Sequence, residues 1–173
     1  AVKSFTAMFL QMWNMMEPGD EDYEKYLCVD CEPVLSGNQG YVIPYNDDPC
    51  NGEDIAEGVY LDILNKAQNY VYIMTPYLIP ENEIITALRF AAQRGVDVRI
   101  ILPHIPDKRT AFALAKSHYR ELTRAGVKIY EYTPGFVHAK VFLSDDKQGV
   151  VGSINLDYRS LYLHYECAAY LYK

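Results

Sequence analysis

The chain has 173 residues, of which 50% are hydrophobic and 23% are charged, and its formal net charge at pH 7 is −7. This length and apolar content are enough for one globular core. No apolar run approaches the roughly 18 residues that indicate a transmembrane helix, and no signal peptide is evident. Because the chain opens on Ala1, directly in a helical pattern, we expect it to be a piece of a longer protein.

The negative charge is concentrated in one part of the chain. Residues 17–57 hold 12 Asp or Glu residues and one Lys, a local charge of −11, which leaves +4 for all other residues. A mildly basic remainder suits a phosphate-containing substrate, since local charge matters more to a ligand than the total. The acidic stretch lacks the spacing of a calcium loop, so we interpret it as a solvated loop rather than a cation site.

The first expected element is an amphipathic helix at residues 2–16. Its apolar residues recur at helical spacing, and they are Phe5, Met8, Phe9, Met12 and Met16. This stripe suits contact with lipid, with a missing part of the protein, or with the core of this chain, and core packing is the favoured interpretation. The turn-rich residues 17–39 are expected to form a loop, so residues 1–40 read as an amino-terminal helix and acidic loop.

From residue 41 to 173 the pattern is that of one α/β domain. After a short strand at 41–45, helices are expected at 54–68, 81–94 and 109–125, and strands at 70–74, 97–102 and 128–131. Asp54 is a candidate N-cap, and Gly95 and Gly126 are placed to end two helices. Strands at 137–143, 148–154 and 163–171 follow without long helices and should include antiparallel pairs. The sequence therefore predicts an α/β fold with a mixed, mostly parallel sheet flanked by helices.

The strongest functional signal is a motif that occurs once. It reads His138-x-Lys140-x4-Asp145, followed by Gly152-Ser153-x-Asn155-x-Asp157. Side chains alternate along a strand, so His138 and Lys140 are expected on one face of strand 137–143. A hairpin with strand 148–154 would bring Ser153 and Asn155 close to them.

These residue types suit chemistry at a phosphate group. The Lys140 ammonium can neutralise a non-bridging oxygen, and Ser153 and Asn155 can donate hydrogen bonds to the other oxygens. The His138 imidazole can attack phosphorus or transfer protons near neutral pH. Glu166, a carboxylate within an apolar stretch, is the candidate for holding the His138 ring in one tautomer.

Other polar residues are weaker candidates. His104 and residues 107–109 follow a strand end, where open α/β sheets often bind ligands, although an ordinary loop explains them equally well. His118 and Tyr119 lie within a helix, and a packing or surface role is favoured for His118. His164 shares a face with Glu166 and could support it, while a partly exposed histidine is the simpler interpretation.

The cysteines favour a reducing, cytoplasmic environment. Cys28-x2-Cys31 could begin a zinc or redox site, but no second ligand pair follows. Cys167 lies in a strand pattern and is interpreted as a small core residue.

The motif residues resemble the HKD motif of the phospholipase D superfamily. Their context, residues 134–140 and 155–160, is similar to bacterial cardiolipin synthases more than to the superfamily's nucleases. Upstream, residues 75–80, 95–103 and 125–132 resemble the same subfamily. The resemblance covers most of the chain from about Tyr41 onward.

This resemblance implies a phospholipase D-type half-domain at residues 41–173. The implied catalytic residues are His138, Lys140 and Asp145, with Lys140, Ser153 and Asn155 binding phosphate, and no metal or cofactor is implied. The expected substrate is phosphatidylglycerol, not nucleic acid, and two molecules would form cardiolipin through a phosphatidyl-histidine intermediate. The resemblance does not decide whether His138 is the nucleophile or the general acid.

Enzymes of this type carry two HKD motifs and amino-terminal membrane helices, so this chain corresponds to a carboxy-terminal half. The implied partner is the amino-terminal half with the other motif, in a protein on the cytoplasmic face of the cell membrane, while the fragment itself is expected to be soluble. Two alternatives remain open. One is a single-motif phosphodiesterase or nuclease that acts as a homodimer, and the other is a non-catalytic half that only binds phosphate.

Overall fold

The computed structural model describes residues 1–17, 19, 22–27, 37, 40–50 and 52–173. The helices are α1 (Val2–Met16), α2 (Tyr23–Leu27), α3 (Ile55–Lys66), α4 (Asn82–Gln93), α5 (Arg109–Arg124) and α6 (Tyr158–Tyr162). The strands are β1 (Tyr41–Asp47), β2 (Tyr70–Met74), β3 (Leu78–Ile79), β4 (Asp97–Pro103), β5 (Lys128–Tyr132), β6 (Val141–Ser144), β7 (Gln148–Gly152), β8 (Leu156–Asp157) and β9 (Glu166–Tyr172). Cys28 and Cys31 lie outside the described residues, as does much of the expected loop 17–39.

Seven strands form one sheet in the order β1-β9-β7-β6-β2-β4-β5, and β3 pairs with β8 separately. β2, β4 and β5 run parallel, with α4 and α5 in the crossovers between them. The pairs β1–β9, β9–β7, β7–β6 and β6–β2 are antiparallel. The predicted mixed α/β fold is confirmed, but its parallel share is smaller than expected, because the described chain beyond β5 holds no helix of crossover length.

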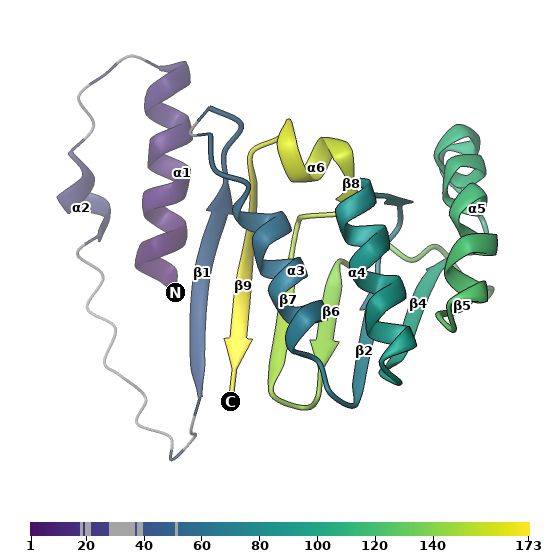
Figure 1. Ribbon diagram of the computed structural model, residues 1–173. Coiled ribbons are helices and arrows are strands. Elements are labelled where there is room, and N and C mark those ends of the chain that lie inside the picture. Colours follow the sequence, from purple (N-terminus) through teal and green to yellow (C-terminus); the bar gives the residue numbers. More distant parts are fainter. Residues whose placement is uncertain (18, 20–21, 28–36, 38–39, 51) are drawn as a thin grey trace.

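The core lies between the sheet and the helices α3 and α4. Figure 1 shows these two helices side by side over one face of the sheet, with α5 beside the β5 edge. Tyr60, Ile63 and Leu64 of α3 are fully buried, as is Leu88 of α4. The Tyr60 ring stacks on that of Phe142 in β6, with centroids 4.1 Å apart, and so connects the helical layer to the middle of the sheet.

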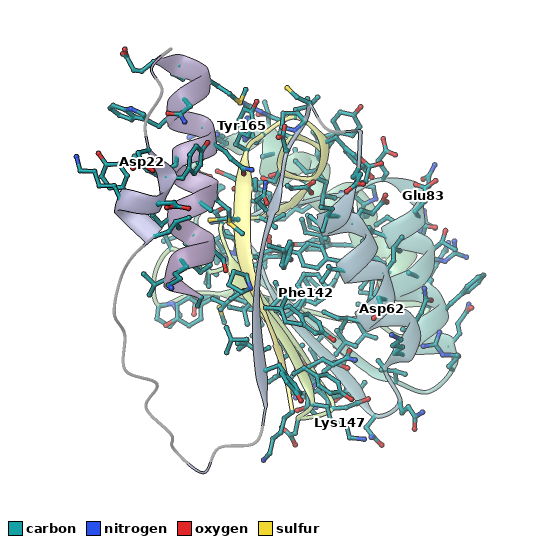
Figure 2. The ribbon with its side chains drawn as sticks, turned by 90° about the vertical axis from the view of Figure 1, so that its left-hand side faces the viewer. Asp22, Asp62, Glu83, Phe142, Lys147 and Tyr165 are labelled. Atoms are coloured by element: carbon teal, nitrogen blue, oxygen red, sulfur yellow. The ribbon has the colours of Figure 1, made fainter. Side chains whose placement is uncertain are left out.

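Helix α1 forms where it was predicted, but it is not a core helix. In Figure 2 it lies on the opposite side of the sheet from α3 and α4. Leu10 is its one buried residue, whereas Phe9, Met12 and Trp13 are exposed. The favoured interpretation of core packing is therefore wrong for this stripe. No helix within the described residues is both long enough and apolar enough to cross a bilayer.

The hairpin of β6 and β7 presents one face to the core and one to solvent. Phe142 and Val150 are paired neighbours that are both buried, while Leu143 and Val151 on the other face are 41% and 48% exposed. Because side chains alternate along a strand, a slip of one residue would exchange these two faces. The apolar pattern therefore fixes the register of the hairpin.

Several local expectations need correction. β6 begins at Val141 rather than at residue 137, so the segment with His138 and Lys140 precedes the paired strand. β9 begins at Glu166 instead of residue 163, and Cys167 within it is exposed rather than part of the core. Gly95 and Gly126 do end their helices, with φ of 94° and 104°, in the left-handed region that glycine tolerates best.

The N-terminus of α3 is capped from outside the helix. Asp54 occupies the N-cap position but makes no capping hydrogen bond, whereas Asp47 Oδ2, at the end of β1, accepts one from the Ala56 N–H at 3.0 Å. The Asp47 side chain is buried, and this burial raises the pKa of its carboxyl group despite the backbone hydrogen bonds that it accepts. Capping by Asp47 ties α3 to the end of β1.

We predict that Tyr60→Phe lowers the free energy of unfolding by about 1–3 kcal/mol, because the Ile154 carbonyl loses its buried partner. The Tyr60 hydroxyl donates to this carbonyl at 3.1 Å, and the ring stacking would be kept. Urea denaturation gives the free energy. Tyr158→Phe is the matched control, because Tyr158 is 46% exposed and should change stability by less than about 0.5 kcal/mol. Equal effects in the two variants would contradict the prediction.

Candidate active site

One end of each of five strands lies on the same side of the sheet, which we call the active edge. It runs across the ends of the strands and is not an edge strand. β6 and β2 are antiparallel, with Val141 opposite Met74, so β6 starts where β2 ends. In the same way β7 ends beside the start of β6, and β9 starts beside the end of β7, where Gly152 pairs with Ala168. β4 is parallel to β2 and ends at this edge too. The segments that follow β2, β4 and β7, or precede β6 and β9, therefore converge where open α/β sheets commonly bind ligands.

His138 and Lys140 lie in the segment that enters β6. The His138 ring is exposed and stacks against Phe136, with centroids 5.9 Å apart. Lys140 is only 9% exposed, and its Nζ donates to the His138 carbonyl at 2.7 Å. This bond uses one of the three N–H donors of the ammonium. Two donors of a cation thus remain beside an accessible imidazole.

Burial dominates the electrostatics of Lys140. Desolvation lowers the pKa of its ammonium, while the negative charges of Glu166, Asp157 and Asp107 act in the opposite direction. Three carboxylates therefore lie within electrostatic range of this buried cation. An anionic phosphate at the edge would act in the same direction as these carboxylates and favour the protonated form of Lys140. The attraction would be strong, because opposite charges attract most strongly where water is excluded.

Ser153 and Glu166 form a second pair at this edge. The Ser153 hydroxyl donates to Glu166 Oε2 in a short hydrogen bond, and its oxygen accepts from the Cys167 N–H at 3.1 Å. Glu166 Oε1 also lies 3.6 Å from His164 Nδ1. The carboxylate contacts Ser153 and His164 rather than the His138 ring, so the described geometry does not bring Glu166 and His138 together as expected.

Gly152 makes the pairing of β7 with β9 possible at this point. A Cβ added to Gly152 would overlap the Cys167 carbonyl oxygen and the Ala168 side chain. Only glycine fits so close to β9, and this contact sets the position of Ser153, the next residue. The Gly-Ser spacing in the sequence does not reveal this close approach.

Asn155 is held by a cap of the short helix α6. Asp157 Oδ1 accepts from the Ser160 N–H at 2.9 Å, and the buried Ser160 hydroxyl accepts from Asn155 Nδ2 at 2.9 Å. Asn155 Oδ1 is buried and has no hydrogen-bond partner within the described part of the chain. A buried polar atom in this state is uncommon, and it marks Asn155 as a residue with unused hydrogen-bonding capacity at the edge.

Thr75 and Tyr77 belong to the same edge, although their place in the resemblance at residues 75–80 predicted no role for them in the site. The buried Thr75 Oγ1 accepts from the Leu156 N–H at 3.3 Å and donates to the Tyr77 carbonyl at 3.0 Å. Burial, together with a 2.5 Å hydrogen bond to Asp107, raises the pKa of Tyr77 to about 12. The available signal was a polar Thr-Pro-Tyr run directly after a strand.

Asp145 lies at the opposite end of β6. Its carboxylate accepts hydrogen bonds from the backbone N–H groups of Gln68, Asn69 and Tyr70 at 2.8–2.9 Å. In Figure 2 the neighbouring Lys147 is at the far end of the molecule from Tyr165, which precedes Glu166. Asp145 therefore ties the β6–β7 turn to the start of β2, and it makes no contact with His138.

His104 follows β4 directly, but its ring contacts β5. His104 Nδ1 is 2.8 Å from Glu131 Oε2, and the Tyr119 hydroxyl donates to the same carboxylate at 3.3 Å. His118 is partly buried on α5. In the described residues, no group of three or more His, Cys, Asp or Glu side chains is arranged to hold a metal ion.

Taken together, the segments at this edge carry an exposed imidazole, a buried ammonium, a hydroxyl and an amide. Such a set can bind a phosphate group and attack it, as in phosphoryl or phosphatidyl transfer. A His-x-Lys segment and a Ser-x-Asn segment at one edge of a mixed sheet define the class as phospholipase D-like α/β domains.

Comparison with known proteins agrees with this class. Residues 60–173 match the family described as "Cardiolipin synthase, PLD-like domain", so the chain belongs to that family. It is 59% identical over 172 residues to an uncharacterized protein of Streptococcus mutans, covering 99% of this chain and 37% of that protein. It is 38% identical over 172 residues to cardiolipin synthase 2 of Bacillus cereus, covering 99% and 33%. The chain thus spans about a third of the length of these relatives.

Solved structures show the same fold at low sequence identity. The phospholipase D family member Nuc of Salmonella typhimurium has a TM-score of 0.64 and is 21% identical, covering 78% of this chain and 84% of that one. The phosphatidylserine synthase of Haemophilus influenzae has a TM-score of 0.59 and is 21% identical, covering 76% and 34%.

We predict that Asp145→Asn destabilises the fold by about 1–3 kcal/mol at neutral pH, because the amide replaces one acceptor oxygen with a donor that faces backbone N–H groups. Burial raises the pKa of Asp145, but the three backbone donors outweigh it and leave the pKa below the ordinary 3.8. The carboxylate therefore stabilises the fold above the unfolded-state pKa, and this contribution is lost as the pH falls through the folded-state pKa.

Urea denaturation at neutral pH and at the lowest pH where both proteins fold tests this. The difference between wild type and Asp145→Asn should shrink at low pH. Asp62→Asn removes an exposed i,i+4 pair with Lys66 and should cost no more than about 0.5 kcal/mol. A pH-independent difference for Asp145→Asn would refute the role given to the ionised carboxylate.

Proposed function

We propose that this chain is one half of a phosphatidyltransferase that makes cardiolipin from two phosphatidylglycerol molecules. The observation that carries this proposal is the exposed His138 imidazole beside the buried Lys140 cation, at an edge that also presents Ser153 and Asn155. Membership of the cardiolipin synthase PLD-like family supports the choice of a phospholipid substrate. Residues 41–173 would form the catalytic half-domain.

The proposed reaction has two displacement steps at phosphorus. In the first, a ring nitrogen of one histidine forms a bond to phosphorus, and the bond from phosphorus to the glycerol oxygen breaks. A second histidine donates a proton to that oxygen, which gives free glycerol and a phosphatidyl-histidine. In the second, a hydroxyl of another phosphatidylglycerol gives its proton to the second histidine and displaces the first, which releases cardiolipin. His138 is either the nucleophile or the proton donor.

The other residues would stabilise charge rather than exchange protons. Lys140 would neutralise a non-bridging oxygen with its two remaining donors. If the Asn155 amide is turned over, Oδ1 can accept from Ser160 and the NH2 group becomes a free donor for a phosphate oxygen. Ser153 would donate to another oxygen when substrate takes the place of Glu166 as its acceptor. Asp145 would act through the fold, by holding the turn of the β6–β7 hairpin.

The second histidine would come from another half-domain. The HKD-like motif occurs once in this chain, and the cardiolipin synthases that it matches are about three times as long. We therefore propose that the amino-terminal half of the same enzyme supplies the counterpart motif, at the cytoplasmic face of the membrane. The chain alone would then bind phosphate but not turn over substrate.

A second candidate is a homodimeric phosphodiesterase, in which two copies of His138 meet. The observation that favours it is the similarity to Nuc, whose chain is 84% covered by this fold. This candidate needs no other half and predicts activity that rises with the square of protein concentration until dimers form.

We predict that the 173-residue chain releases no glycerol from phosphatidylglycerol by itself and gains activity when the matching amino-terminal half is added. His138→Ala should abolish the gained activity, because it removes one of the two required imidazoles. His118→Ala is the matched control, because this partly buried histidine lies within α5 and outside the candidate site, so the change should leave activity unchanged. Glycerol release and cardiolipin formation are measured together.

The same assay separates the alternatives. Activity of the chain alone on a simple phosphodiester, lost in His138→Ala, would replace the half-enzyme with the homodimer. No activity with the matching half added would leave only phosphate binding. Quenching a reaction of phosphate-labelled lipid with detergent at alkaline pH, where a phosphorus–nitrogen bond survives, decides the role of His138. Label on the 173-residue chain that is lost in His138→Ala identifies His138 as the nucleophile, whereas label on the other half identifies it as the proton donor.

We further predict that Lys140→Ala abolishes phosphate binding by the isolated chain, because a phosphate dianion loses its cation at the edge. The His138 ring signals in an NMR titration with inorganic phosphate report the binding. Lys147→Ala removes an exposed cation at the far end of the molecule and should leave the titration unchanged. Unaltered binding in Lys140→Ala would argue against the proposed phosphate site.

A further inference from the structure

A cavity of about 270 Å³ lies between helix α1 and the active edge of the sheet. Phe5, Met8 and Met12 of α1 line one side, while Ser153 and Glu166 line the other. The cavity therefore shares Ser153 and Glu166 with the candidate active site. One wall is formed by α1, which contributes no residue to the buried core cluster.

The two ends of this cavity differ in chemistry. The α1 wall consists of methionine and phenylalanine side chains together with Gln11, and Lys3 is the only charged residue among residues 2–16. Methionine side chains adapt readily to irregular apolar ligands. The opposite end holds Ser153 and Glu166, and Glu166 is one of the charges that act on Lys140. A ligand that fills the cavity would be apolar over α1 and polar toward Lys140.

Charge decides which part of a phospholipid can enter. Asp47, Asp48 and Glu166 all lie on the wall opposite α1, so an anionic phosphate is disfavoured inside the cavity and favoured beside Lys140. An uncharged hydrocarbon chain meets no such repulsion. Its burial against the exposed Met12 and Phe9 would remove apolar surface from water on both partners.

We propose that this cavity binds one acyl chain of the phospholipid whose phosphate group is held at His138 and Lys140. The proposal rests on the proposed function, since it takes the substrate to be a phospholipid. The volume suits part of one chain rather than a whole lipid, because sites that enclose a drug-sized ligand are larger, at about 300–1,000 Å³. The other possible occupants of this face are a second copy of the chain or a partner protein.

Trp13 makes the proposal directly measurable. It is the single tryptophan of the chain, it lies on α1, and its ring stacks on Phe9 with centroids 5.9 Å apart. Bromine quenches tryptophan fluorescence only at short range. The probe is a monoacyl phosphatidylglycerol brominated along its chain and kept below its critical micelle concentration, with the unbrominated lipid as reference. We expect the brominated lipid to quench Trp13 in a saturable way.

Chain length gives the second readout. Affinity for unbrominated monoacyl phosphatidylglycerols, measured by displacement of the brominated probe, should rise roughly fourfold for each added CH2 until the cavity is full, and then level off. Glycerophosphoglycerol, which has no chain, should not displace the probe at comparable concentrations. An affinity that does not depend on chain length would overturn the proposal.

Two variants on α1 provide a matched pair. Met12→Glu places a charge in the cavity wall, whereas Met16→Glu places the same charge on a residue that is 82% exposed and does not line the cavity. Met12→Glu should weaken lipid binding by at least about tenfold, equivalent to 1.4 kcal/mol, and Met16→Glu should leave it unchanged. Circular dichroism and urea denaturation check that both variants fold. An equal loss in both would overturn the proposal.

The outcomes are separable from those of the proposed function, because fluorescence quenching requires no turnover. Saturable, chain-dependent quenching that Met12→Glu weakens supports the acyl-chain cavity even where no lipid is transferred. Transfer that depends on His138 without cavity-dependent quenching would overturn the cavity and leave the proposed function standing. Self-association that excludes the probe and is abolished by Met12→Glu would assign this face to a second copy instead.

Discussion

The candidate site depends on the register of one antiparallel hairpin. The Asp145 carboxylate accepts three backbone hydrogen bonds from residues 68–70, and so it fixes the β6–β7 turn against the start of β2. At the other end of the same strands, this register determines where the segments with Lys140 and Ser153 leave the sheet. A slip of one residue would turn Phe142 and Val150 out of the core. Packing at the centre of the β6–β7 hairpin and hydrogen bonding by Asp145 at its turn thus position Lys140 and Ser153 at its open end.

A second constraint is the burial of a charge. Lys140 is 9% exposed, and desolvation lowers the pKa of its ammonium, yet three carboxylates lie within electrostatic range of it. Such a cation is poorly solvated by water and is held near acidic groups, so a phosphate that comes within reach gains more than it would from a surface lysine. The same carboxylates oppose a second negative charge nearby. The site is therefore suited to one phosphate group at a defined position rather than to a polyanion along a surface.

The sequence predicted that the segments carrying His138, Lys140, Ser153 and Asn155 are neighbours, because hairpin connectivity acts over short distances, and the β6–β7 pairing with the Gly152 N–H bond to the Lys140 carbonyl places these segments side by side. It did not predict that the His138 segment lies outside the strand, where Lys140 turns back to the His138 carbonyl. Nor did it predict that Glu166 bonds to Ser153, or that Gly152 is required by the close approach of β9. The last two features arise from contacts with β9, which the local sequence pattern does not reveal. For α1, periodicity predicted an apolar face correctly, but it holds no information on what that face contacts.

The proposed acyl-chain cavity gives the apolar face of α1 a role in orienting the lipid substrate. Helix α1 lies across the sheet from α3 and α4 (Figure 2). The cavity between α1 and the active edge has charged residues on one side and apolar residues of α1 on the other. A lipid is itself a polar group joined to apolar chains, and it can meet both surroundings at once only in one orientation. In that orientation its phosphate faces His138 and its chain lies along α1. A phosphodiester without chains would lack the second contact, so a helix outside the core would help to distinguish a lipid from other phosphodiesters.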